Sequence, residues 1–176
     1  MQVTLTPRQL RMGANHAVER KVESLCGEFR NHDRKTTEFA WRDEIEGTLA
    51  EMAVAEALKL PWTGARNWDA PADVGDNIQV RWAADSTRCL IIRPGDSDTD
   101  NFFLVTGELG VYQIHGWVSG AEGKNPDFMK APNGRPPAFF VPQWALHRLA
   151  GDASIPPPAQ APAISGANLA KFSVTR

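Results

Sequence analysis

Residues 72–81 have the sequence Ala-Asp-Val-Gly-Asp-Asn-Ile-Gln-Val-Arg, and this stretch decides the predicted fold. It opens with Asp and Gly, which are common turn residues. The residues then alternate between polar and apolar, so Gln79 and Arg81 share one face of a strand and apolar residues share the other. The stretch predicts a turn that enters a strand with a polar pair on one face.

A long helix is predicted immediately before this stretch, over residues 41–60, and it stops at Pro61. Acidic residues in its first turn suit the helix dipole. From Thr48 onward nearly every face is apolar, and the many Ala residues would allow close approach to a sheet. We expect this helix to be central, and it carries Glu51.

A second helix is predicted over residues 7–30, where Thr6 is an N-cap and Pro7 stands in the first turn. Arg20 and other charged residues occupy its remaining faces. Apolar residues recur at helical spacing and predict a stripe that packs against the outside of the core. The stripe consists of Leu10, Ala14, Ala17, Val18, Val22, Leu25 and Phe29.

Short apolar runs separated by Asp- and Gly-rich loops predict strands further along the chain. The runs are residues 78–83, 88–93, 101–106 and 111–118, with a shorter one at 138–141. Their hairpin spacing predicts a mixed, largely antiparallel sheet and an α/β (α+β) fold class. Residues 120–137 are expected to form a polar loop, and residues 143–149 a short helix.

The length of 176 residues suits one domain over residues 1–150. The Pro/Ala-rich residues 151–176 predict a stiff arm that could join subunits in a homo-oligomer. We expect no membrane contact, because no apolar run approaches the ~20 residues of a membrane span. With no signal-peptide core and only two distant cysteines, a reducing cytoplasm is the expected location.

The net charge of −2 excludes a strongly basic DNA-binding protein, but the charge is unevenly distributed. Residues 1–42 have eight Lys or Arg against five Asp or Glu, and residues 43–60 have five acids against one Lys. The division would suit an acidic centre beside a mildly basic surface, and it is also compatible with ordinary surface variation.

Glu51 and Asp73 are the candidate acidic residues. An unpaired buried carboxylate costs several kcal/mol, so Glu51 is expected to have a functional role, a rim position or a salt bridge to a residue such as Arg81. Asp73 is either a functional acid or an ordinary turn residue, and Asp76 competes for its role. Gln79 and Arg81 are expected to face the helix with Glu51, in a site or in a hydrogen-bonded network.

Other candidates come from later in the chain. Lys124, Lys130 and Arg135 lie in the predicted long loop and could follow a DNA backbone. His115 is expected to be a satisfied core histidine, and the run at 96–100 a solvated turn. Three tryptophans near the proposed site could stack on bases, although most Trp are expected in the core or a lid. They are Trp62, Trp68 and Trp82.

Three segments resemble the PD-(D/E)XK nuclease-like superfamily and, more loosely, its small phage-encoded members. They are residues 47–58, residues 72–81 and residues 134–142, and with their spacing the likeness covers roughly residues 44–146. The resemblance implies a restriction-endonuclease-like mixed sheet flanked by helices. It also implies a phage protein located in the host cytoplasm.

The resemblance assigns a role to each candidate residue. Asp73 would be the principal metal ligand, Glu51 a second carboxylate, and the Val80 carbonyl a further oxygen ligand. Gln79 would take the (D/E) place and Arg81 the Lys place. The implied function is hydrolysis of DNA phosphodiesters with Mg²⁺ or Mn²⁺ as cofactor.

Two departures from the family pattern open alternatives. Gln79 is neutral, so a metal would meet one fewer negative charge. Arg81 is always charged and cannot exchange a proton with water, although it could hold a phosphate. The alternatives are a catalytically inactive module of the same fold that binds nucleic acid or a host protein, and a phage structural or assembly protein.

Overall fold

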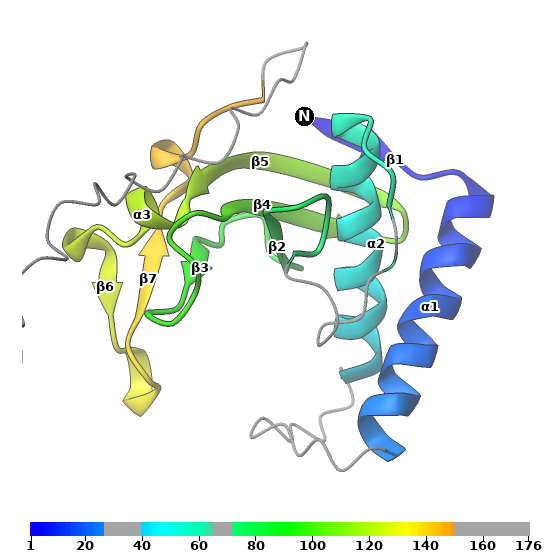
Figure 1. Ribbon diagram of the computed structural model, residues 1–176, viewed down its shortest axis with the longest axis horizontal. Helices are drawn as coiled ribbons and strands as arrows, with labels where there is room; N and C mark the ends of the chain where they lie inside the picture. The colour runs from blue at the N-terminus through cyan, green and yellow to red at the C-terminus, as the bar shows by residue number, and fades with distance from the viewer. Residues whose placement is uncertain (27–39, 63, 65–71, 150–176) are drawn as a thin grey trace, which may run out of the picture.

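The computed structural model describes residues 1–26, 40–62, 64 and 72–149, and these form a mixed α+β protein (Figure 1). The predicted C-terminal arm, residues 27–30 of the predicted first helix and Trp68 lie outside the described residues. The principal elements are β1 (Gln2–Thr4), α1 (Pro7–Cys26), α2 (Ala40–Leu58), β2 (Ile78–Ala83), β3 (Leu90–Ile92), β4 (Asn101–Glu108), β5 (Val111–Ser119), β6 (Met129–Lys130) and β7 (Ala138–Val141).

The first sheet has four strands in the order β1-β5-β4-β2. β2 pairs in parallel with β4, whereas β4 with β5 and β5 with β1 are antiparallel. In the parallel pair, Arg81 lies opposite Leu104 and Val80 opposite Phe103. β2 is therefore the edge strand of this sheet next to β4. Each β2 residue lies on the same face of the sheet as the β4 residue that it pairs with.

The second sheet has three antiparallel strands in the order β3-β7-β6. The single predicted sheet is thus wrong in this respect, while the largely antiparallel pairing is confirmed. β3 does not pair with β2 or β4, which flank it in sequence, but with β7, which follows much later. Local hairpin spacing could not reveal this non-local pairing.

The first sheet is covered on both faces, which gives the molecule its layers. α2 packs on one face, with a core that includes Val54, Val80 and Phe103. The second sheet packs on the other face, with a core that includes Ile92 and Leu104. α1 lies against α2 on the outside (Figure 1). Among the described residues, every helix is too short or too polar to cross a lipid bilayer.

α1 does not bury the stripe predicted from its apolar residues. Val22 and Leu25 are exposed. Of the predicted stripe only Ala17 is fully buried, together with Gly13 and Arg20, and these three residues repeat at helical spacing. A side-chain carbon at Gly13 would lie 2.6 Å from atoms of Leu49 and Met52 on α2. Small residues therefore let the two helices approach closely, and this close contact decides which face of α1 is buried.

The remaining predicted elements agree with the structure to different degrees. β2 and β7 have the predicted bounds, and both predicted long helices are present as α1 and α2. The predicted helix over 143–149 is only a short 3₁₀ turn, η3 (Gln143–Ala145). The predicted loop over 120–137 contains α3 (Gly120–Gly123), η1 (Pro126–Phe128), β6 and η2 (Pro132–Gly134). α3 starts at a capping box that Ser119 and Glu122 form.

Candidate functional site

Gln79 and Arg81 lie on the face of β2 opposite to α2, so the predicted orientation toward the Glu51 helix is wrong. Ile78, Val80 and Trp82 are the β2 residues that pack in the core with α2. The Arg81 guanidinium instead lies 5.2 Å from the centre of the Phe102 ring, on the side of the second sheet. The helix with Glu51 is apolar at its sheet contact, so it takes the apolar face of β2.

Glu51 is buried, with 7% of its surface exposed, and its carboxylate pairs with Arg20 of α1. Arg20 donates a hydrogen bond from Nη1 to Glu51 Oε1 at 3.1 Å, and its Nε lies 3.2 Å from Glu44 Oε1. Arg20 is itself buried, so this ion-pair group joins α1 to α2 within the protein. The predicted salt bridge of Glu51 therefore exists, but its partner is Arg20 and not Arg81.

The environment of Glu51 opposes its ionisation. Burial, and then the nearby charge of Asp73, raise the pKa of Glu51 to about 7, although Arg20 acts in the opposite direction. The indole N–H of Trp62 also favours the charged form, but it is buried without a hydrogen bond of normal geometry. Glu51 and Asp73 are thus close enough for their charges to interact.

Asp73 lies in the turn that leads into β2, and its side chain reaches the backbone of that strand. Its Oδ2 accepts a hydrogen bond from the Val80 backbone N–H at 2.7 Å. Burial raises the pKa of Asp73, while the Val80 hydrogen bond and the charges of Arg81 and Arg20 lower it. Asp73 is partly buried and Asp76 is exposed in the same turn, so Asp73 is the acid that the fold engages.

Asp100 is an acidic residue that sequence reasoning missed. Its Oδ2 accepts a hydrogen bond from Gln79 Nε2 at 3.1 Å, and its charge also acts on Asp73. The middle of the run at 96–100 is exposed, as expected of a solvated turn, but Asp96 and Asp100 at its ends are partly buried. The signal was its position directly before β4, beside the start of β2.

A second buried carboxylate, Glu46, lies nearer the start of α2. Its Oε2 accepts a hydrogen bond from the Tyr112 hydroxyl at 2.5 Å, and its Oε1 accepts one from the Leu109 backbone at 3.3 Å. Burial and this hydrogen bond raise the pKa of Tyr112. Glu46, like Glu51, is thus hydrogen-bonded within the fold.

The predicted metal ligands do not fit a divalent-cation centre in this arrangement. Glu51 is held by Arg20, and one oxygen of Asp73 is used by the Val80 N–H. Within the described ranges, no group of three or more His, Cys, Asp or Glu side chains could hold a metal ion. Mg²⁺ prefers several oxygen ligands with a net negative charge, and here Arg20 already supplies the positive charge.

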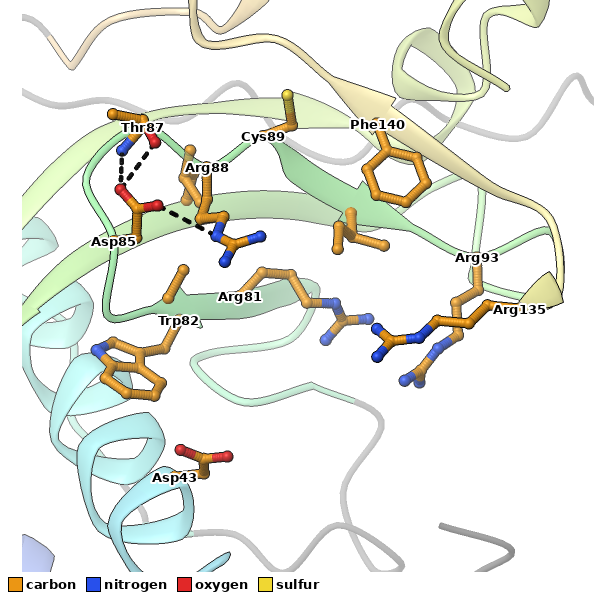
Figure 2. A pocket seen from close by; sticks show the side chains of 13 residues that line it. Asp43, Arg81, Trp82, Asp85, Thr87, Arg88, Cys89, Arg93, Arg135 and Phe140 are labelled. Atoms are coloured by element: carbon orange, nitrogen blue, oxygen red, sulfur yellow. Dashed lines mark hydrogen bonds and ion pairs between the residues drawn. The ribbon is translucent and has the colours of Figure 1, made fainter. Parts of the chain in front are cut away.

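A cavity of about 740 Å³ opens on the other side of β2 (Figure 2). It lies where Arg81 and Leu104 of the first sheet face residues on and beside the second sheet, among them Ile91 and Phe140. Trp82 lies at one end, as one of the tryptophans predicted near a site. The charged residues of its lining are Asp43, Arg81, Asp85, Arg88, Arg93 and Arg135.

The arginines of the cavity differ in how they are compensated. Arg81 Nη2 lies 3.2 Å from Asp96 Oδ2, and Arg88 Nε lies 3.4 Å from Asp85 Oδ2. Arg93 and Arg135 are exposed, and their side chains have no ion pair or hydrogen bond within the part of the chain that the structure describes. The cavity therefore holds positive charge that the protein does not neutralise.

The three predicted nucleic-acid contacts have different surroundings. Lys124 donates hydrogen bonds to the Asp96 carbonyl at 2.5 Å and to Asp98 Oδ1 at 2.6 Å, so it stabilises a loop. Lys130 is exposed on β6. Arg135 lines the cavity. Only Arg135 is therefore placed with other cations around a common space.

His115 is hydrogen-bonded, as expected, but it is half-buried and is not part of the core. Its Nε2 is 2.7 Å from Thr106 Oγ1 on the neighbouring strand. Burial, together with the nearby N-terminal amine and Arg148, lowers the pKa of His115. It lies on a strand that does not line the cavity, so it has no part in the candidate site.

Comparison with known proteins gives no relative from which a role could be transferred. No protein-family model, no curated protein and no solved structure matches this chain.

Proposed function

We propose that this protein is a nucleic-acid-binding module, that it binds phosphates in the arginine-lined cavity, and that its fold is of the restriction-endonuclease-like type without a working metal centre. The observation that carries the proposal is the cavity itself. Four arginines and two aspartates line it, and Arg93 and Arg135 have no counter-charge among the described residues. Arg is the side chain best suited to phosphate oxygens, because its planar fork binds them bidentately.

The order of elements supports a nuclease-like origin. α2 contains Glu51, Asp73 stands at the entrance of β2, and Gln79 and Arg81 follow on that strand. The resemblance of the sequence to the PD-(D/E)XK superfamily implies the same order. The order of elements therefore supports membership in that superfamily, which is part of the proposal.

The charge pattern favours binding over hydrolysis. Arg81, which takes the place of a catalytic Lys, turns toward the cavity and away from Glu51. Glu51 is paired with Arg20, and burial raises its pKa to about 7. A phosphate in the cavity would therefore meet arginines on one side of the sheet, while the paired carboxylate Glu51 lies on the other.

Fluorescence anisotropy with labelled single-stranded and duplex DNA tests this function. The wild-type chain should bind DNA more weakly as the salt concentration rises. The double variant Arg93→Ala/Arg135→Ala should bind at least about tenfold more weakly, and the slope of log affinity against log salt should decrease by the equivalent of about two phosphate contacts. The matched control is Arg8→Ala/Arg11→Ala, which removes two exposed arginines from α1. Equal losses in both double variants would overturn the assignment of the cavity.

Incubation of the same DNA with Mg²⁺ or Mn²⁺ tests the hydrolytic alternative. One observation favours that alternative, which is the proximity of Glu51 and Asp73. The proposal expects no cleavage. Cleavage that disappears in Glu51→Gln and in Asp73→Asn would replace it with the metal-dependent deoxyribonuclease.

A further inference from the structure

One end of the cavity concentrates its positive charge. Figure 2 shows the guanidinium groups of Arg81, Arg93 and Arg135 gathered there, while Asp43 lies away from them on α2, below Trp82. The three arginines come from β2, from the residue after β3 and from the residue after η2. Segments that are distant in sequence thus bring three cations to one place.

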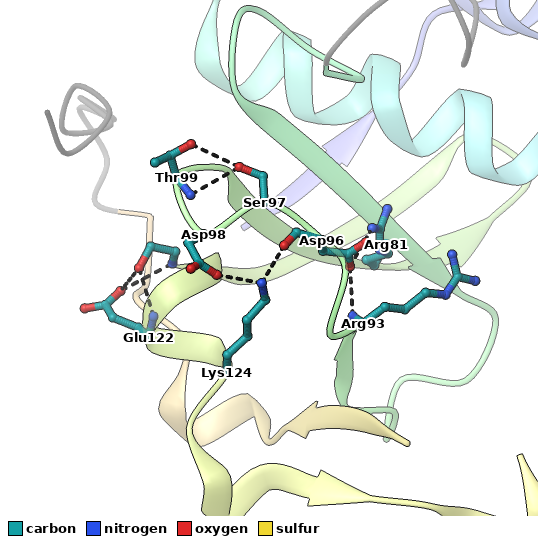
Figure 3. A network of polar contacts seen from close by, with 9 residues as sticks. Arg81, Arg93, Asp96, Ser97, Asp98, Thr99, Glu122 and Lys124 are labelled. Carbon is teal, nitrogen blue, oxygen red and sulfur yellow. Dashed lines mark hydrogen bonds and ion pairs between the residues drawn. The ribbon is translucent and has the colours of Figure 1, made fainter. Parts of the chain in front are cut away.

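The loop at 93–100 holds this end in position (Figure 3). Asp96 Oδ2 accepts hydrogen bonds from Arg81 Nη2 at 3.2 Å and from the Arg93 backbone N–H at 2.8 Å. Lys124 then binds the Asp96 carbonyl and the Asp98 carboxylate. Asp96 therefore binds the side chain of Arg81 and the backbone of Arg93, and Lys124, which follows α3, holds the backbone of Asp96.

The charge that remains at this end is close to two units. Asp96 compensates Arg81, whereas Arg93 and Arg135 are left with no compensating side chain in the described ranges. An internal phosphodiester has a single negative charge. A terminal phosphomonoester has a charge of about −1.5 to −2 at pH 7 and three acceptor oxygens. Two uncompensated guanidinium groups match the second ligand better than the first.

We propose that the arginine end of the cavity binds the terminal phosphomonoester of a nucleic-acid strand. This inference rests on the proposed nucleic-acid binding and specifies which part of the strand enters. The volume of about 740 Å³ lies within the range of small-ligand pockets, so a terminal nucleotide has room beyond its phosphate. Phe140 also lines the cavity, and its ring offers a surface on which a base can stack (Figure 2).

Matched oligonucleotides of one sequence test the inference by anisotropy. One carries a 5′-phosphate, one a 3′-phosphate and one hydroxyl groups at both ends, with the label at the end that is not varied. The expected result is at least about tenfold tighter binding of one phosphorylated form than of the hydroxyl form. The advantage should shrink between about pH 7.5 and about pH 5.5, because the phosphate loses its second negative charge.

Variants connect this advantage to the cavity. Arg93→Ala and Arg135→Ala should each reduce the preference for the phosphorylated strand, and Arg93→Lys should restore it in part, because Lys keeps the charge but not the fork. The Arg8→Ala/Arg11→Ala control should keep the full preference. Thermal unfolding of each variant checks that the fold is intact.

The outcomes separate the two proposals. Equal affinity for phosphorylated and hydroxyl strands, with both weakened by Arg93→Ala, would overturn the terminal-phosphate inference and leave nucleic-acid binding in place. Absence of binding to every oligonucleotide would overturn both. Competition by inorganic phosphate that removes only the advantage of the phosphorylated strand would support the phosphomonoester site.

Discussion

The two faces of the first sheet treat charge in opposite ways. On the α2 face, Arg20, Glu44 and Glu51 are paired with one another inside the protein. On the cavity face, Arg93 and Arg135 are exposed and uncompensated within the described residues. Charges that satisfy one another stabilise a fold or are tolerated by it, whereas charges left open to solvent are available to a ligand. Glu51, the helix acid singled out by the sequence, thus lies in the less available of the two regions.

Removal of Arg20 should have the largest effect on the folded state. Arg20→Ala would leave Glu51 buried without its cation, and breaking a buried pair in this way costs about 3–5 kcal/mol. Urea unfolding at neutral pH measures the change. Arg11→Ala on an exposed face of the same helix is the control and should change stability by less than about 0.5 kcal/mol. A similar small loss for Arg20→Ala would contradict the buried pairing.

The pH dependence of stability should be the next largest effect. The fold raises the pKa of Glu51 from 4.5 to about 7, so the folded chain binds more protons than the unfolded chain in this window. The contribution of Glu51 to unfolding free energy therefore falls as pH rises from about 4.5 to about 7, by up to about 3 kcal/mol.

Glu51→Gln isolates that contribution, because it removes the titrating group and keeps the shape. The difference in unfolding free energy between Glu51→Gln and wild type should shift in favour of the variant between about pH 5 and about pH 8. Chemical denaturation across this range gives the curve. A difference that stays constant with pH would mean that Glu51 ionises normally in the fold.

Tyr112→Phe should have a smaller effect on the same face. It removes the hydroxyl that donates to Glu46 and leaves a buried carboxylate oxygen without this donor, at a cost of about 1–3 kcal/mol. Thermal unfolding of the variant measures it. An unchanged stability would show that Glu46 finds another donor or water.

The smallest effect on stability should come from the cavity. Arg93→Ala/Arg135→Ala should change the unfolding free energy by less than about 0.5 kcal/mol, because neither side chain has a partner to lose within the described chain. The same variant should show the large loss of DNA affinity described above. A marked destabilisation would erase the contrast between the two faces.

The sequence predicted the elements near the site better than their orientation. The bounds of β2 followed from alternation, and α2 followed from its apolar run before Pro61. Alternation established that Gln79 and Arg81 share a face, but not which face. Because α2 covers one side of the sheet and the second sheet covers the other, either orientation gives buried apolar residues.

Arg20 and the cavity show what pattern reasoning missed and why. Arg20 stands at helical spacing from Gly13 and Ala17, and a search for small residues instead of large apolar ones would have found this face. The cavity depends on β3 pairing with β7 and on Arg135 approaching Arg81 from a remote segment. No local pattern marks such an approach, since each arginine alone is typical of a solvated surface.

The hydrogen bond from the Val80 N–H to Asp73 has a consequence for how this protein behaves among copies of itself. Beyond the Val74–Ile78 bridge, β2 has no neighbouring strand on its outer edge within the described residues. On that edge the Asp73 carboxylate accepts the hydrogen bond of the Val80 backbone N–H. An open strand with free donors recruits strands from other molecules, and charge in that position discourages this. Loss of the Asp73 carboxylate would therefore promote strand addition and aggregation, which links this acid to solubility as well as to any ligand.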